Sequence, residues 1–219
     1  MRNGNTPIVV EGYPFIFGAA AVTAALAFLA VKVHPAFGVP AAVSLVLTLF
    51  IVFFFRNPER HTPSDEKAVV SPADGRVIYL GTVTEPHTGQ RMEKVSIFMS
   101  VFSVHVNRAP VSGKVVDGFY TSGKFLDVRH ERATFENEQQ GLVLETADGA
   151  RLVVVQVAGL VARRIVCYAR TGDALIRGRR YGLIRFGSRL DVYLPVGTAV
   201  KVRLGDRTAA GETVLGILP

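Results

Sequence analysis

Two long uncharged runs near the N-terminus constrain the fold of this chain more than any other feature. Residues 15–31 form a run of 17, and residues 35–55 a run of 21, without a charged side chain. As α-helices they would be about 26 Å and about 30 Å long, close to the hydrocarbon thickness of a bilayer. The connection between them is short, so both ends of such a hairpin lie on one side. We therefore predict an N-terminal hydrophobic helical hairpin.

The same two runs have other interpretations. A secretory signal peptide fits poorly, because Glu11 interrupts the approach to the first run and a second, longer run follows almost at once. A hairpin that enters the bilayer without crossing it stays open, since it places both of its ends on the same side as a spanning hairpin does.

Positive charge follows the second run. Arg56, Arg60 and Lys67 lie beyond it, whereas Lys32 is the only charged residue between the two runs. This imbalance favours the cytoplasm for the basic end, so we expect a protein of the inner cell membrane with a cytoplasmic soluble part. Six of the seven net positive charges lie beyond residue 55 and would attract anionic lipid head groups. The sequence contains no recognised nucleic-acid-binding motif, and we expect no nucleic-acid partner.

The rest of the chain has the pattern of a mainly β protein. Valine-rich runs alternate with glycine turns from residue 69 to residue 217, which is typical of a barrel or sandwich. The strands expected from these runs include residues 151–157 and 200–204. The charged segment 127–140 is expected to form a loop or one short helix. We therefore divide the chain into a hairpin with a polar linker at residues 1–60 and a β domain at residues 61–219.

Two internal repeats indicate a duplicated architecture. Residues 72–77 and 110–115 share a Pro-x-x-Gly-basic-Val pattern, and residues 172–178 and 205–211 share a Gly-Asp-x4-Gly pattern. Turns of the second kind resemble those of lipoyl and biotinyl carrier domains, whose β-sandwich has two quasi-equivalent halves. We therefore expect a duplicated lipoyl/biotinyl-like β-sandwich, also called a barrel-sandwich hybrid. A carrier function is disfavoured, because no lysine lies at the tip of a suitable hairpin.

A Gly-Ser pair separates two strand-like patterns near the C-terminus. Gly187 and Ser188 follow an apolar run and precede an alternating one at residues 190–194, which predicts a tight turn between strands. Glycine leaves its carbonyl unhindered, so the hydroxyl of Ser188 could attack the carbonyl of Gly187. A polar turn without chemistry is the commoner meaning of such a pair.

Longer motifs give this pair a family context. Residues 182–195 resemble the self-cleavage segment of the short, bacterial and archaeal type of phosphatidylserine decarboxylase proenzyme. Residues 98–110 are similar to the histidine motif of the same family, and residues 71–75 to its aspartate motif. Several motifs in the family's order are far more specific than any one of them, and the resemblance runs from about residue 56 to the end.

The resemblance implies that the chain cleaves itself between Gly187 and Ser188. The serine hydroxyl would add to the glycine carbonyl, and the resulting ester would eliminate. Residue 188 would then become a pyruvoyl group at the start of fragment 188–219, which would stay associated with fragment 1–187. A base is needed twice, and His105 would serve as that base with Asp74 orienting it.

The resemblance also implies the substrate. The pyruvoyl group would bind the amine of phosphatidylserine as a Schiff base and accept electrons as CO2 leaves, which gives phosphatidylethanolamine. The hairpin would bring the enzyme to a lipid that stays in the bilayer. The candidate substrate-binding residues are Arg108, Asn137, Glu138, Arg163 and Arg164.

The histidine motif departs from that of longer family members. Arg108 stands where they commonly have a second histidine, and Ser103 where they have an aspartate. The division of roles between His105 and Arg108 therefore stays open: Arg108 could hold the substrate carboxylate or phosphate, or be structural. Either Arg163 or Arg164 could pair with a lipid phosphate.

Two other functions remain as alternatives. A non-catalytic, membrane-tethered scaffold would not cut itself after Gly187. A serine hydrolase could use Ser188 with His105 and Asp74, although the Gly-x-Ser-x-Gly elbow is absent. Cys167 is the only cysteine and the histidines lack metal-ligand spacing, so neither an intramolecular disulfide nor a metal site is expected. The oligomeric state, including a homo-oligomer, stays open.

Overall fold

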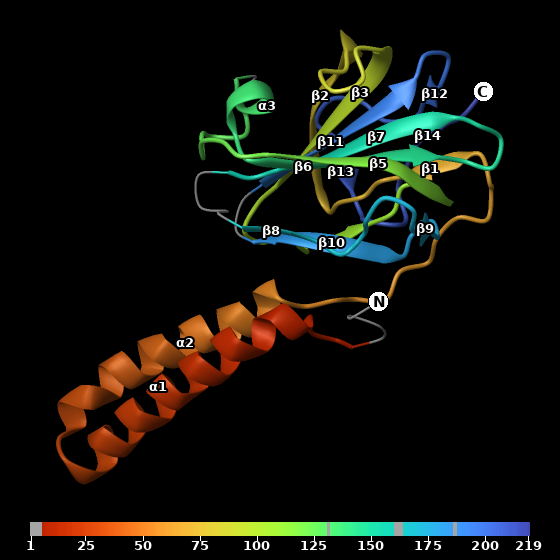
Figure 1. Ribbon diagram of the computed structural model, residues 1–219. Coiled ribbons are helices and arrows are strands. Elements are labelled where there is room, and N and C mark those ends of the chain that lie inside the picture. The colour runs from red at the N-terminus through yellow and green to blue at the C-terminus, as the bar shows by residue number, and fades with distance from the viewer. Residues whose placement is uncertain (1–5, 131, 160–163, 186–187) are drawn as a thin grey trace. The chain divides into compact units, whose positions relative to one another are not determined.

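The structure is a computed structural model that describes residues 6–130, 132–159, 164–185 and 188–219. The chain divides into two compact units (Figure 1). The first ends at Glu59 and the second is Arg60–Pro219.

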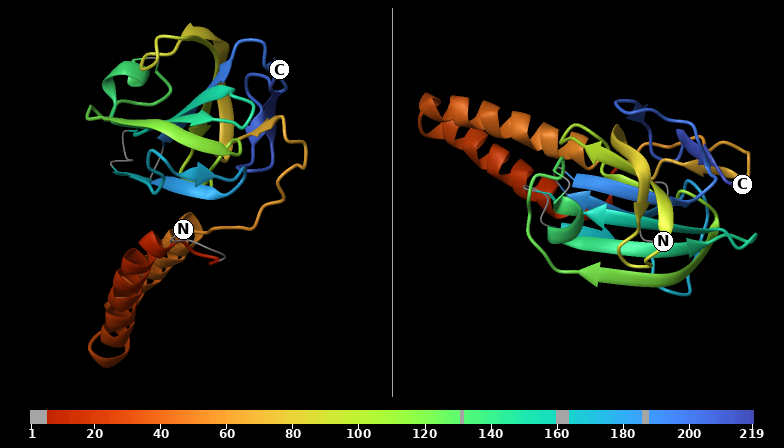
Figure 2. Two further views of the ribbon diagram at one scale, coloured as in Figure 1. Left: turned by 45° about the vertical axis from the view of Figure 1, so that its right-hand side comes forward. Right: turned by 90° about the horizontal axis from the view of Figure 1, so that it is seen from above.

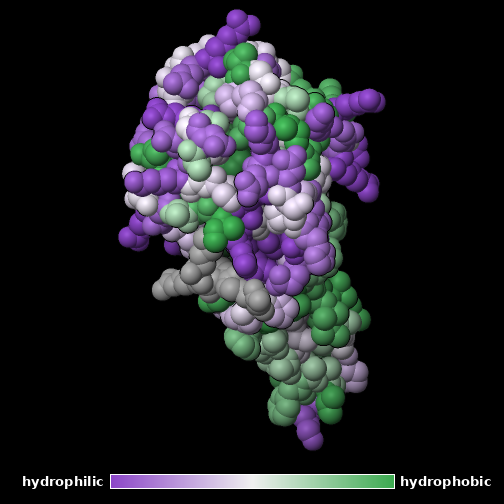
Figure 3. All heavy atoms as spheres, turned by 90° about the vertical axis from the view of Figure 1, so that its right-hand side faces the viewer, coloured by the Kyte–Doolittle hydropathy of each residue, from purple (hydrophilic) through white to green (hydrophobic). Residues whose placement is uncertain are grey.

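The first unit is a helical hairpin. A 3-10 turn, η1 (Val10–Gly12), leads into α1 (Tyr13–Lys32), and a second, η2 (Pro35–Phe37), connects it to α2 (Gly38–Phe54). Both helices are long and apolar enough to cross a membrane. On the face that Figure 3 shows, most of the hairpin surface is hydrophobic. The hairpin expected from the sequence is therefore confirmed.

Three hydroxyl groups join the two helices of the hairpin. The Oγ1 of Thr23 on α1 lies 2.8 Å from the Oγ of Ser44 and 3.0 Å from the Oγ1 of Thr48, both on α2. Hydrogen bonds of this kind hold apolar helices together where burial of apolar surface in lipid gives no driving force. At the open end, Asn57 Nδ2 donates to the carbonyl of Thr6 at 2.7 Å, so both ends of the hairpin lie on the same side.

The described residues of the second unit form antiparallel strands and one short helix. The strands are β1 (Ala68–Val70), β2 (Gly75–Thr84), β3 (Arg91–Met99), β4 (Val106–Arg108), β5 (Gly113–Thr121), β6 (Gln139–Glu145), β7 (Arg151–Val157), β8 (Arg164–Cys167), β9 (Ala174–Leu175), β10 (Arg180–Arg185), β11 (Ser188–Pro195), β12 (Ala199–Val200), β13 (Arg207–Thr208) and β14 (Val214–Ile217). The helix, α3 (Ala133–Glu136), lies within the segment expected to be a loop or short helix.

These strands form three sheets. The largest has eight strands in the order β13-β2-β3-β11-β7-β6-β5-β9, and it is strongly curled (Figure 2). Two three-stranded sheets have the orders β4-β10-β8 and β1-β14-β12. The mainly β fold is therefore confirmed, whereas a match to lipoyl or biotinyl domains in particular stays a prediction.

The repeats found in the sequence adopt the same local structure. At the first Gly-Asp-x4-Gly turn, backbone N–H groups donate to carbonyls from Gly172 to Val115, from Val115 to Asp173 and from Gly178 to Ala109. At the second turn, the equivalent bonds run from Gly205 to Val77, from Val77 to Asp206 and from Gly211 to Ser71. The glycines that open and close each Gly-Asp-x4-Gly turn have φ between 75° and 97°, a conformation that glycine adopts without strain. Two equivalent turns thus connect equivalent strands.

Strand β11 lies in the middle of the large sheet and separates two layers. Leu190, Val192 and Leu194 face the main core, whereas Tyr193 packs in a second cluster on the opposite face. Side chains alternate between the faces of a strand, so Ser188 continues the inner series and Arg189 points outward. The first residue of β11 therefore faces the core between the sheets.

A buried ion-pair network occupies the outer face of β11. Asp191 is 1% exposed; its Oδ1 lies 2.8 Å from Arg189 Nε and its Oδ2 lies 3.1 Å from Lys94 Nζ. Arg189 also donates to the carbonyl of Val128 and to Thr134 Oγ1, both at 2.7 Å. Burial alone would raise the pKa of the Asp191 carboxyl, but Arg189 and Lys94 bring it below its ordinary value. The network fixes the segment that precedes β6 onto β11.

Replacing Asp191 with Asn should destabilise the β unit by about 3–5 kcal/mol at neutral pH, because two buried cations lose their counter-charge. The stabilisation is present above the ordinary carboxyl pKa of about 3.9 and is lost as the pH falls through the lower pKa of the folded state. Urea unfolding in detergent, followed by circular dichroism, would therefore give a difference from the unaltered chain that shrinks toward acid pH. Asp148→Asn on an exposed turn is the control. A difference that does not change with pH would contradict the prediction.

Candidate active site

Ser188 lies where the chain passes from one sheet to another. Strand β10 belongs to the three-stranded sheet β4-β10-β8, whereas Ser188 begins β11 in the eight-stranded sheet. Ser188 is fully buried, is paired with Met99 on β3, and has its Oγ 3.4 Å from the Sδ of Met99. The strands expected on both sides of the Gly-Ser pair are confirmed. Gly187, and with it the expected turn, lies outside the described residues.

His105 is fixed to the strand that leads to Ser188. It precedes β4, and its carbonyl accepts a hydrogen bond from the N–H of Ile184 on β10 at 3.3 Å. Ile184 comes four residues before Ser188 in the chain. The His105 side chain is 2% exposed. Where β4 pairs with β10, the predicted base is thus hydrogen-bonded to a residue that lies four positions before the predicted nucleophile.

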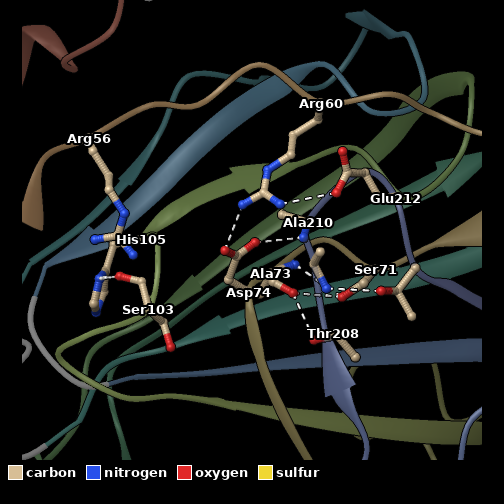
Figure 4. A network of polar contacts seen from close by, with 12 residues as sticks. Arg56, Arg60, Ser71, Ala73, Asp74, Ser103, His105, Thr208, Ala210 and Glu212 are labelled. Atoms are coloured by element: carbon tan, nitrogen blue, oxygen red, sulfur yellow. Dashed lines mark hydrogen bonds and ion pairs between the residues drawn. The ribbon is translucent and has the colours of Figure 1, made fainter.

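A backbone carbonyl sets the tautomer of His105. The Nδ1 atom lies 2.9 Å from the carbonyl oxygen of Ser103 (Figure 4). A carbonyl only accepts hydrogen bonds, so Nδ1 carries the proton and Nε2 is the basic nitrogen of the neutral ring. The turn that presents this carbonyl is closed by bonds to Ser100, from Ser103 N to the Ser100 carbonyl at 2.9 Å and from Phe102 N to Ser100 Oγ at 3.3 Å.

Asp74 forms a different set of contacts. Its Oδ2 lies 2.7 Å from Arg60 Nη2, and its Oδ1 accepts from the N–H of Ala210 at 2.7 Å (Figure 4). Arg60 also pairs with Glu212 at 3.1 Å. Both carboxylate oxygens are therefore engaged, and the orienting contact on His105 comes from Ser103. A catalytic role for Asp74 stays a prediction.

Arg108 is held between the two repeated glycine turns. Its side chain donates to the carbonyl of Gly178 at 2.8 Å and is largely buried. A Cβ on Gly211 would lie 2.9 Å from the Cδ of Arg108, so glycine at that position makes room for the arginine. A structural role is visible in these contacts, and a role in binding substrate stays a prediction.

The remaining predicted binding residues are spread over a neighbouring loop and strand. Asn137 is fully buried and bonds to both the N–H and the carbonyl of Leu126 at 2.9 Å and to the carbonyl of Ala158 at 2.8 Å. Glu138 is half-buried beside it, and Arg164 is exposed at the start of β8. Arg163 lies outside the described residues. Asn137 thus shapes the loop, and contact of this group with substrate stays a prediction.

The structure adds two residues that the sequence analysis did not single out. Gln156 on β7 donates from Nε2 to Oδ1 of Asn107 on β4 at 2.8 Å, and both side chains are buried. Asn107 Nδ2 donates in turn to Met99 Sδ at 3.8 Å, the same sulfur that Ser188 contacts. A signal existed in the sequence: Gln156 is the one polar residue in a valine run at 153–157.

Comparison with known proteins identifies the family of this chain. The sequence profile of the phosphatidylserine decarboxylase family matches residues 47–216. The chain belongs to the phosphatidylserine decarboxylase family. It is therefore a decarboxylase, which is a lyase, and the family resemblance seen in the sequence is confirmed.

Similar proteins cover the whole chain. Those named phosphatidylserine decarboxylase proenzyme include a protein of Citrifermentans bemidjiense at 73% identity and one of Geobacter metallireducens at 68%, each over 219 residues. A third, from Pelobacter propionicus, is 59% identical over 220 residues. In each case the match spans 100% of both chains.

Replacing Gly182 with Ala should disturb the layer between the sheets. Gly182 is paired with Asn107, and a Cβ there would collide with the carbonyl oxygen of Val166 and lie 3.1 Å from Nε2 of Gln156. Overpacking of this kind costs about 1–3 kcal/mol, which urea unfolding would measure. The control is Gly118→Ala, where the nearest atom, Thr171 Oγ1, is 3.5 Å away. Equal free energies of unfolding for the two variants would contradict the predicted overpacking at Gly182.

Proposed function

We propose that this chain is a membrane-bound proenzyme that converts phosphatidylserine to phosphatidylethanolamine with a pyruvoyl group made from its own Ser188. Family membership supports the reaction, and the proenzyme names of the relatives support self-processing. One observation carries the proposal: β10, which is hydrogen-bonded to His105, leads within four residues to the buried Ser188.

The contacts of His105 and Ser188 suit self-cleavage. Nε2 of His105 is the basic nitrogen, so it can take the proton of the Ser188 hydroxyl as the oxygen adds to the carbonyl of residue 187. The same base can then remove the α-proton of residue 188 when the ester eliminates, which releases the chain that ends at residue 187. The dehydroalanine left at residue 188 would tautomerise to an imine, and water would hydrolyse this imine to the pyruvoyl carbonyl with loss of ammonia. Because Ser188 is fully buried before the cut, water is kept from hydrolysing the ester, which would leave an ordinary serine instead.

The surroundings of Ser188 fit a pyruvoyl group. Such a group supplies a carbonyl that binds the substrate amine as a Schiff base and withdraws the electrons left when CO2 departs. Residue 188 would remain in place after the cut, because β11 is hydrogen-bonded to β3 on one side and β7 on the other. Its side chain faces the inner layer with that of Met99, and His105 is available to return a proton to the substrate carbon.

The two fragments would stay associated through the sheets. Within fragment 188–219, β11 pairs with β3 and β7, β13 pairs with β2, and β14 pairs with β1. The Arg60–Glu212 ion pair and the bond from Ala210 to Asp74 also connect the two fragments. Cleavage would thus leave the fold intact.

The hairpin suits a lipid substrate. A two-chain phospholipid stays in the bilayer, so a hairpin that anchors residues 1–60 brings the catalytic domain at 61–219 to its substrate. The basic residues after α2 favour the cytoplasmic face of the inner membrane. The absence of a Gly-x-Ser-x-Gly elbow around Ser188 argues against a serine hydrolase.

Ser188→Ala should leave one uncut chain of 219 residues, because the hydroxyl that attacks is gone. The unaltered chain should give fragments 1–187 and 188–219 by intact mass spectrometry, and the two should co-elute until denatured. Borohydride reduction with phosphatidylserine should add one lipid to the smaller fragment only. Ser64→Ala, on an exposed stretch, should behave like the unaltered chain. Cleavage of Ser188→Ala between residues 187 and 188 would contradict the proposal.

His105→Ala should slow cleavage by about 100-fold or more, the usual contribution of a general base. The fraction of uncut chain over time, in chains synthesised in a cell-free system with liposomes, measures this. His130→Ala, at an exposed histidine, provides the matched control. Cleavage of His105→Ala at the control rate would assign the base to another residue.

A further inference from the structure

A pair of buried amides lies between the two sheets that meet at Ser188. Asn107 is on β4 in the three-stranded sheet, and Gln156 is on β7 in the eight-stranded sheet. They are 0% and 1% exposed, and Gln156 Nε2 donates to Asn107 Oδ1 at 2.8 Å. Burying polar groups costs free energy unless they are well bonded, so a polar pair in this apolar layer calls for an explanation.

The bond from Gln156 fixes the orientation of the Asn107 side chain. An amide oxygen accepts and an amide nitrogen donates, so Oδ1 of Asn107 must face Gln156. Its Nδ2 therefore faces the other way, where it meets Met99 Sδ at 3.8 Å. A thioether sulfur is a weak acceptor, so the contact leaves the donor capacity of this N–H group largely unused.

Ser188 contacts the same sulfur atom. Its Oγ lies 3.4 Å from Met99 Sδ, and the backbones of the two residues are paired between β11 and β3. Gln156 and Leu190 are also paired, on β7 and β11. The N–H of Asn107 and the O–H of Ser188 thus converge on one sulfur within a buried layer.

We propose that Asn107 is a further catalytic residue of self-cleavage and that Gln156 is its positioning residue. The inference rests on the proposed function. As the oxygen of Ser188 bonds to the carbonyl carbon of residue 187, its proton passes to the base and the carbonyl electron pair moves to the carbonyl oxygen. Asn107 donates its N–H to this negatively charged oxygen. Collapse then breaks the C–N bond, the nitrogen takes a proton, and an ester forms with no atom gained or lost.

The exchange of acceptors makes this contact catalytic. In the resting chain the N–H of Asn107 meets a weak sulfur acceptor, and in the transition state it meets an anionic oxygen. An interaction that strengthens only in the transition state raises the rate. Removal of one donor of this kind typically costs about 100- to 1000-fold in rate.

Asn107→Asp gives the decisive test, because it keeps the shape and exchanges the N–H for a titratable oxygen. Near neutral pH the carboxylate cannot donate and repels the developing charge, so cleavage should slow by about 100-fold or more. At lower pH the protonated acid can donate its O–H. A buried carboxyl titrates above its ordinary pKa of about 3.9. The ratio of its cleavage rate to that of the unaltered chain should therefore rise as the pH falls.

Matched variants separate this chemistry from simple loss of structure. Gln140→Glu is the control for Gln156→Glu, because Gln140 is the residue paired with Gln156 on the neighbouring strand. Gln140 donates to the carbonyls of Phe119 and Gly141, so the Gln140→Glu chain should cleave at the normal rate. Gln156→Glu removes the donor that orients Asn107 and should slow cleavage, and Asn107→Ala should be slow without recovery at low pH. Each substitution is also made together with Ser188→Ala, so that folding is compared by circular dichroism in uncut chains.

The outcomes are distinct. Cleavage of Asn107→Asp at the rate of the unaltered chain near neutral pH would overturn the inference. Slow cleavage with a ratio that does not change with pH would overturn it as well, because a purely structural defect behaves in that way. An unaltered chain that stays uncut would overturn the proposed function itself, and the inference with it.

Discussion

The hydrogen bonding of β11 on both edges is the constraint on which the rest of the structure depends. Each residue of this strand is paired with β3, and Arg189–Tyr193 are also paired with β7. The alternation of side chains then places Ser188 in the inner layer and Arg189 in the outer ion-pair network. In the proposed self-cleavage, the same bonds would hold residue 188 in place once the chain ahead of it is cut, so one strand would serve both the precursor and the mature form.

Two buried polar side chains near Ser188 each have a local hydrogen-bond partner. His105 bonds to the carbonyl of Ser103, and Asn107 bonds to Gln156. These contacts offset the cost of burial, and each fixes a direction: the first defines the basic nitrogen and the second defines where the amide N–H points. The proposed attack of Ser188 on the carbonyl before it joins two neighbouring residues of one chain, so that step would need no open path for a second molecule.

Much of the architecture follows from local pattern. The apolar runs predicted the hairpin, and the valine-rich run at 151–157 predicted a strand with the bounds observed for β7. Shorter elements did not follow: a strand expected at 200–204 is the two-residue β12, and β4 was not expected. Strands of two or three residues form because a partner strand is already in place, as β10 is for β4. So short a segment has too few residues to show the alternating pattern that would predict a strand.

The sequence by itself determined the apolar helical hairpin, the mainly β domain, the family, and the residue types that the proposed chemistry needs. Only the tertiary structure decided which of them meet. The pairing of β4 with β10 brings His105 to the strand before Ser188, while Asp74 is engaged by Arg60 and Ala210. Asn107 and Gln156 lie 49 residues apart in the chain. The physical reason is register: pairing between distant strands sets which face each side chain occupies, and that choice is made by the whole sheet rather than by any one segment.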